Sequence, residues 1–146
     1  MKRDTAGLYR ALDQLVILQP EDEALKNNFA QISLLLNVNL PRALTIARAL
    51  HDAHPHNAAL ASTYAFALFR SRDAQAALKV MSQLTPGQLS DPSVATYYGI
   101  MLSGAGQADS AARYLAAAKE AKLLPEEEDL VARAKASIAL AQPATH

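Results

Sequence analysis

A period of 34 residues constrains this chain more than any other feature of its sequence. Shifting the sequence against itself by that length aligns Ala43, Ala77 and Ala111. Other positions that align at the same shift are Ala30, Tyr64 and Tyr98; Gln31, Ala65 and Gly99; Leu34, Leu68 and Leu102; Ala47, Met81 and Leu115; and Leu50, Leu84 and Ala118. Because the alignment needs no gap, the sequence predicts three successive copies of one structural unit.

Each unit is expected to contain two helices joined by a turn. In the third unit, apolar residues at helical spacing lie on both sides of a glycine-containing break at residues 104–106. Asn57, Asp73 and Asp91 can each cap a helix that begins at the next residue, and Pro86-Gly87 is expected to end one. Small residues in the aligned positions allow two helices to approach closely. The sequence therefore predicts an all-α chain of antiparallel helix pairs.

These residues resemble the tetratricopeptide repeat family, whose helix-turn-helix unit has the same length and a similar order of small and large residues. The clearest match is the third unit, with Tyr98-Gly99, Leu102, Gly106, Ala111, Tyr114, Leu115 and Ala118. The chain departs from the family pattern in having no tryptophan, in Gln31 and in Leu89. The resemblance implies a right-handed superhelix, with repeats at residues 24–57, 58–91 and 92–125.

The segments on either side of the three units are each expected to form one helix, which makes about eight helices in all. In the N-terminal helix, residues 4–19, Leu8, Leu12 and Leu15 reproduce an apolar spacing of the second helix of a unit, which suggests half of a preceding repeat and a longer protein. Residues 126–141 begin with an acidic turn that suits a helix N-terminus. We expect this segment to be a capping helix over the last repeat.

The resemblance also implies where a partner would bind. In this family the first helices of successive units line a concave groove. The candidate groove residues here are Asn28, Ile32, Leu35, Ser62, Phe66, Phe69, Arg70, Thr96, Tyr97 and Ile100. The apolar members could bury a peptide, while the polar ones and Arg70 could orient it. The sequence therefore predicts a non-catalytic module, part of a larger scaffold protein, that binds a peptide or helix segment of another protein.

Three alternatives remain open at this stage. Phe66 and Phe69 could pack between helices, because aromatic residues at helical spacing are more often part of the core. The N-terminal face could stack on a second copy, so that the chain is a structural or self-assembling domain and a homo-oligomer. His51, His54 and His56 could hold a metal ion in an enzyme, although histidine is also favourable near a helix C-terminus.

Composition and charge exclude several other classes of function. Basic and acidic residues both number 14, so the chain has no net charge to attract nucleic acid. Cysteine is absent, which excludes thiol catalysis, and the glycines lack the spacing of a phosphate-binding loop. The longest uncharged run, residues 92–108, is too polar to span a bilayer. We therefore expect no enzyme activity, no cofactor, no nucleic-acid partner and no membrane insertion, in a soluble cytoplasmic or periplasmic protein.

Overall fold

The computed structural model describes residues 4–141, and this part of the chain is all-α, without a β-strand. The prediction of an all-α fold is therefore confirmed. In chain order the helices are α1 (Thr5–Leu18), α2 (Glu23–Leu36), α3 (Leu40–Ala53), α4 (Ala58–Arg70), α5 (Ala74–Met81), α6 (Pro86–Leu89), α7 (Pro92–Gly104), α8 (Ala108–Leu115), the 3-10 helix η1 (Ala116–Glu120) and α9 (Pro125–Ala141).

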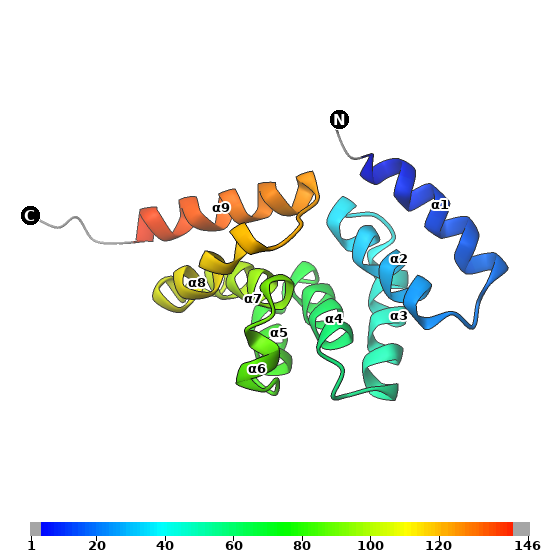
Figure 1. The fold of residues 1–146 in the computed structure, drawn as a ribbon, viewed down its shortest axis with the longest axis horizontal. Helices are drawn as coiled ribbons and strands as arrows, with labels where there is room; N and C mark the ends of the chain where they lie inside the picture. The colour runs from blue at the N-terminus through cyan, green and yellow to red at the C-terminus, as the bar shows by residue number, and fades with distance from the viewer. Residues whose placement is uncertain (1–3, 142–146) are drawn as a thin grey trace, which may run out of the picture.

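Helices that follow one another in the sequence pack together. The structure pairs α1 with α2, α2 with α3, α4 with α5, and α7 with α8. Figure 1 shows these pairs in succession across the molecule, from α1 to α8. The first helices of the three predicted units also contact one another, α2 against α4 and α4 against α7. One continuous face is therefore formed by α2, α4 and α7.

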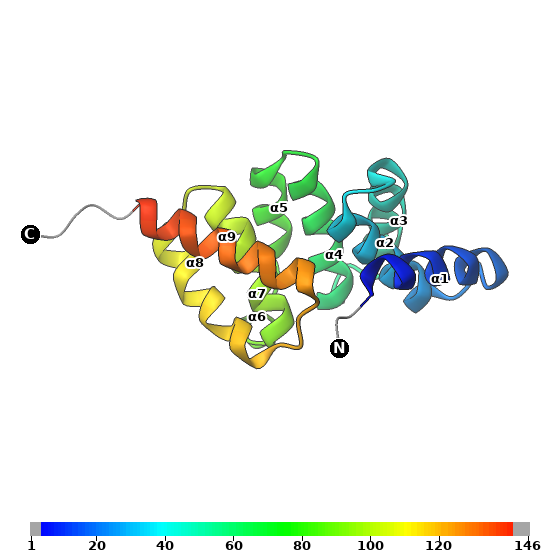
Figure 2. The ribbon, with the colours of Figure 1, turned by 90° about the horizontal axis from the view of Figure 1, so that it is seen from above.

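Helix α9 lies across the last pair, where it contacts α7 and α8 and also reaches α2. Figure 2 shows it running along the side of α8 and α7. Val131, Ala134 and Ile138 are buried, as expected for a helix that covers its neighbours. Neither α9, the longest helix at 17 residues, nor any other helix within residues 4–141 has the length and apolar character needed to cross a membrane.

Side-chain caps fix the starts of several helices, and the sequence predicted the caps of α4, α5 and α7. Asn57, Asp73 and Asp91 each accept a hydrogen bond from a backbone N–H in the first turn of the following helix, at 3.0 to 3.2 Å. Such bonds satisfy N–H groups that have no partner inside the helix. Local chemistry therefore determines where α4, α5 and α7 begin.

The prediction that Pro86-Gly87 ends a helix is wrong. Helix α5 ends at Met81, and Pro86 instead begins the single-turn helix α6. Thr85 and Gln88 form a capping box around this turn, in which the side chain of each accepts the backbone N–H of the other. Together with η1, this turn accounts for the helical segments beyond the eight that were expected.

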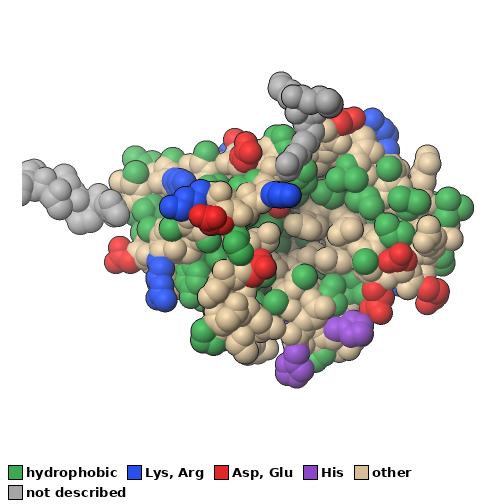
Figure 3. All heavy atoms as spheres, in the orientation of Figure 1, with side chains coloured by type: hydrophobic (Ala, Val, Ile, Leu, Met, Phe, Trp, Pro, Cys, Tyr) green, Lys and Arg blue, Asp and Glu red, His purple; other side chains and the backbone are tan. Residues whose placement is uncertain are grey.

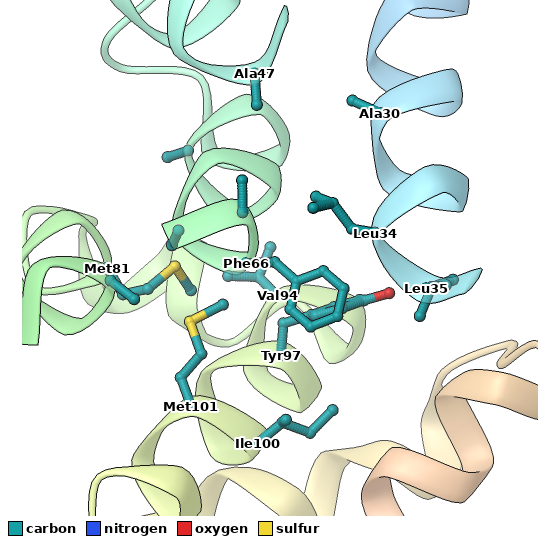
Figure 4. Close-up of a cluster of buried hydrophobic side chains, with 14 of the residues drawn as sticks. Ala30, Leu34, Leu35, Ala47, Phe66, Met81, Val94, Tyr97, Ile100 and Met101 are labelled. Carbon is teal, nitrogen blue, oxygen red and sulfur yellow. The ribbon is translucent and has the colours of Figure 1, made fainter. Parts of the chain in front are cut away.

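The core is built where small residues let helices approach. Ala43, Ala77 and Ala111 are fully buried. A Cβ atom placed on Gly99 would lie 2.7 Å from Cγ and 3.0 Å from the backbone nitrogen of Leu115, so α7 and α8 are in close contact there. Figure 4 shows larger side chains from α2, α4, α5 and α7 converging in the space between the helices.

Candidate functional site

A pocket of about 690 Å³ opens between α2, α4, α7 and the turn that contains α6. Its volume is within the range of roughly 300–1,000 Å³ that is usual for ligand sites. In Figure 3 the molecule is hollowed near the centre of the face shown, and much of the surface around the hollow is tan, the colour of the backbone and of side chains that are neither hydrophobic nor charged. We call this site the central pocket; it is lined by Asn27, Gln31, Ala58, Ala59, Ser62, Thr63, Phe66, Thr85, Gly87, Gln88, Asp91, Ser93, Val94 and Tyr97.

The ten candidate groove residues lie in different surroundings. Ser62, Phe66 and Tyr97 line the central pocket, each with only a small part of its surface exposed. Asn28 is exposed and borders two smaller hollows next to α2 instead. The remaining apolar and hydroxyl candidates are buried in the core; these are Ile32, Leu35, Thr96 and Ile100.

Phe69 and Arg70 contact other parts of this chain. The ring of Phe69 lies where a side chain on Gly104 would have to go, so Phe69 packs against the end of α7. The Arg70 guanidinium donates through Nε to the carbonyl of Leu34 at 3.0 Å and through Nη2 to that of Leu35 at 3.5 Å. A cation at this position stabilises the C-terminus of α2. Arg70 therefore satisfies backbone carbonyls and does not line the central pocket.

A hydrogen-bonded network links the central pocket to α9. Nε2 of Gln31 donates to the hydroxyl of Tyr97 at 3.2 Å, and that hydroxyl donates to Oε2 of Glu127. The other carboxylate oxygen of Glu127 accepts the backbone N–H of Leu124 at 2.8 Å. Glu127 is only 6% exposed, although the sequence assigned it simply to an acidic first helical turn. These hydrogen bonds therefore hold side chains of α2, α7 and α9 together.

The environment of Tyr97 predicts a loss of stability at alkaline pH. Burial, together with the charge of Glu127, raises the pKa of Tyr97 well above its ordinary value of 10. Above about pH 10 the unfolded chain loses a proton that the folded chain keeps at Tyr97. The free energy of unfolding should therefore fall as pH rises, by up to about 1.4 kcal/mol per pH unit from this group. Urea unfolding across this pH range measures the slope.

Tyr97→Phe is the control for this prediction, because it removes the titrating hydroxyl and keeps the ring. We expect this variant to be less stable at neutral pH, where Glu127 loses a donor, but to show a shallower decline above about pH 10. Equal slopes in the two proteins would contradict the assignment to Tyr97.

The histidines that suggested a metal site have other contacts. Nε2 of His54 lies 2.8 Å from a carboxylate oxygen of Glu23, and the His51 ring stacks on Tyr64 with 5.1 Å between centroids. Within residues 4–141, no three His, Asp or Glu side chains are placed to hold a metal ion. The structure does not bring His51, His54 and His56 together as a ligand set.

The central pocket offers hydrogen-bonding groups, and the almost fully buried rings of Phe66 and Tyr97 border it. Phe66 and Tyr97 meet edge to face, with 4.9 Å between ring centroids. No histidine or lysine is among the described lining residues, so they include neither of these two common acid–base groups. Comparison of the chain with models of known protein families and with curated proteins finds no match.

Proposed function

We propose that this chain is a non-catalytic module, similar to tetratricopeptide repeats, that binds a peptide or helix segment of another protein in the central pocket. The observation that carries the proposal is the pocket itself, formed where α2, α4 and α7 meet. These are the helices on which the family resemblance places a binding groove. In the same proposal, the helix pairs form a right-handed superhelix within a larger scaffold protein.

The lining supports a peptide as the bound species. Hydroxyl and carboxamide side chains can pair with the backbone of a peptide, while Ala58 and Ala59, which are not fully buried, offer apolar surface to one of its side chains. The walls are packed helices, and Phe66 and Tyr97 are almost fully buried, so the contact groups are already in place. Preorganised walls reduce the entropy lost on binding, which favours affinity.

The test uses peptides selected from a random peptide library displayed on phage. Ala59 lies on the rim of the central pocket and is exposed, so Ala59→Trp should fill the pocket without disturbing the core. Selected peptides should lose at least about tenfold in affinity on this change, a loss of about 1.4 kcal/mol in binding free energy. Fluorescence anisotropy with labelled peptides measures the dissociation constants.

The matched control is Ala49→Trp, which puts the same side chain on an exposed position of α3 outside the pocket. It should leave the affinity unchanged, and circular dichroism should show equal helicity in all three proteins. The proposal fails if the library yields no binding peptide, or if both tryptophan variants bind the peptides as wild type does.

Self-assembly is a second candidate function, and one observation favours it. Helix α1 exposes Leu8, Ile17 and Leu18, the last two at 68% and 75%. Exposed apolar side chains on one helix can mark a protein-protein contact. In this alternative a second copy of the chain covers α1, and the central pocket has no ligand.

A further inference from the structure

The hydrogen-bonded network beside the central pocket fixes the orientation of one carboxamide. An ionised carboxylate only accepts hydrogen bonds, so the hydroxyl of Tyr97 gives its single proton to Glu127. The hydroxyl oxygen can then only accept from Gln31, and the atom of Gln31 that lies 3.2 Å from it is therefore Nε2. The backbone N–H of Leu124 holds the other carboxylate oxygen of Glu127 in place. The charge of Glu127 thus determines which end of the Gln31 carboxamide faces Tyr97.

This orientation leaves the carbonyl oxygen of Gln31 available on the pocket lining. Gln31 is partly exposed and lines the central pocket. Within residues 4–141, its Oε1 forms no hydrogen bond and is not one of the polar atoms that are buried without a partner. Oε1 of Gln31 is therefore an acceptor that solvent, or a bound group, can reach.

The other carboxamides of the described lining do not offer such an acceptor. Oε1 of Gln88 accepts the backbone N–H of Thr85 at 2.9 Å, and Oδ1 of Asn27 is inaccessible to solvent. The hydroxyl groups of the lining can each donate or accept, so they do not discriminate between donors and acceptors of a ligand. A carboxamide of fixed orientation does discriminate, because only its carbonyl is presented.

We infer that Oε1 of Gln31 accepts a backbone N–H of an extended peptide segment in the central pocket, and that Glu127 sets this polarity through Tyr97. An extended segment offers N–H groups along its length, whereas a helix has unpaired ones only in its first turn. Gln31 is then a specificity-determining residue, and Glu127, which is not among the described lining residues, is a positioning residue. The inference rests on the proposed function, because it names the backbone conformation that the peptide site selects.

Glu127→Gln should reverse the polarity of the network with little change in stability. The oxygen of the new carboxamide can still accept from Leu124, while its NH2 group takes the place of Oε2 and donates to Tyr97. The buried proton of Tyr97 then needs another acceptor, which Gln31 provides by turning its carboxamide over. The pocket then presents an N–H donor in place of the carbonyl.

NMR of the free chain tests this reversal without any peptide. In the wild type, the side-chain NH2 protons of Gln31 should show nuclear Overhauser contacts with the ring of Tyr97, and these contacts should weaken in Glu127→Gln. Glu128→Gln is the matched control, because Glu128 is exposed in the same turn of α9 and the change in charge is equal. It should leave the contacts unchanged. Equal contacts in all three proteins would overturn the role of Glu127.

Peptides selected from the phage library are the probe for binding. Each backbone amide of a selected peptide is replaced in turn by an ester, which removes one N–H and keeps the side chains. One replacement should weaken binding to the full chain about tenfold. The same replacement should cost clearly less in Gln31→Met, which removes the carboxamide at nearly equal length. The difference measures the coupling between that N–H and Gln31, and fluorescence anisotropy gives the dissociation constants.

The same peptides show whether Glu127 acts through Gln31. In Glu127→Gln the ester should no longer be penalised, because the pocket then presents a donor and no longer needs the N–H of the peptide. Glu128→Gln should retain the full effect. A purely structural role for Glu127 would instead lower the midpoint of urea unfolding and weaken the amide and ester peptides alike.

The outcomes separate this inference from the proposed function. If no ester position couples to Gln31, and Ala59→Trp still abolishes peptide binding, the inference is overturned while the peptide site stands. If the coupling exists but persists in Glu127→Gln, the role of Glu127 is overturned. If circular dichroism shows that Gln31→Met does not fold, Glu127→Gln, which keeps Gln31, decides the result. If no peptide binds, or if Ala59→Trp has no effect, the proposed function fails and the inference fails with it.

Discussion

The Phe66→Ala variant should lose about 3–5 kcal/mol of its free energy of unfolding, which is a large part of the stability of an ordinary domain. Phe66 is only 1% exposed. Its ring lies 4.9 Å from Tyr97 and 6.4 Å from Phe69 between centroids, with the guanidinium of Arg70 above it. Figure 4 shows Phe66 among buried side chains from α2, α4 and α7. Deleting its ring therefore leaves a cavity between these helices. Urea unfolding followed by circular dichroism measures the loss.

Phe66→Leu is the control, because it keeps an apolar side chain in the same place and should cost clearly less. A loss below about 1 kcal/mol in Phe66→Ala would show that the ring is not part of the core. The expected result has a practical consequence. Phe66→Ala is a poor probe of binding, since it tests folding first, and Ala59→Trp is the better variant.

Gly99→Val should cost about 3 kcal/mol, at the upper end of the usual range for overpacking. Any side chain on Gly99 would meet Leu115 from α8, including its backbone nitrogen at 3.0 Å. The backbone of α8 cannot move away from an added side chain as the end of a flexible side chain can. The variant therefore has to separate α7 from α8 or distort one of them, and urea unfolding should show the loss.

Gly87→Val provides the comparison for this second variant. Gly87 is exposed, and the nearest atom to a Cβ placed there is Oγ1 of Thr85 at 3.9 Å. We expect its effect to stay within about 0.5 kcal/mol, which is usual for a surface change. Equal losses at the two glycines would mean that β-branching in a helix causes the effect, and not the contact with Leu115.

Features that depend on local chemistry could be predicted from the sequence. The caps at Asn57, Asp73 and Asp91 each involve residues two or three positions apart, so their spacing is visible in the chain. The capping box of Thr85 and Gln88 was equally visible, and the error at Pro86-Gly87 came from treating that pair only as a helix stop. Helix η1 follows α8 without a proline or glycine to mark the change, so the sequence gives no signal for it.

The candidate site was only partly predictable, because it depends on how helices cross. Ser62, Phe66 and Tyr97 were predicted to face a groove, and they line the central pocket. Asn27 was not among the candidates, although it also lines this pocket. Which side of α2 faces this pocket depends on the angle between neighbouring helices, and periodicity within one helix does not specify that angle.

The network around Glu127 shows a second limit of sequence patterns. Tyr97 and Glu127 are 30 positions apart and belong to α7 and α9. An acidic first turn is favourable in any helix, so the composition of α9 gave a sufficient local explanation for Glu127. Its burial becomes visible only when α9 is placed across α7.

The central claim is that the face formed by α2, α4 and α7 binds a peptide, and NMR mapping tests it most directly. A library-selected peptide is titrated into the isotope-labelled chain, and the changes in backbone amide shifts are followed. The account predicts the largest changes at lining residues such as Ala59, Gln88 and Ser93, with little change on α1 and α3. Changes concentrated on α1, or shifts that depend on protein concentration and not on peptide, would contradict the claim and favour self-assembly.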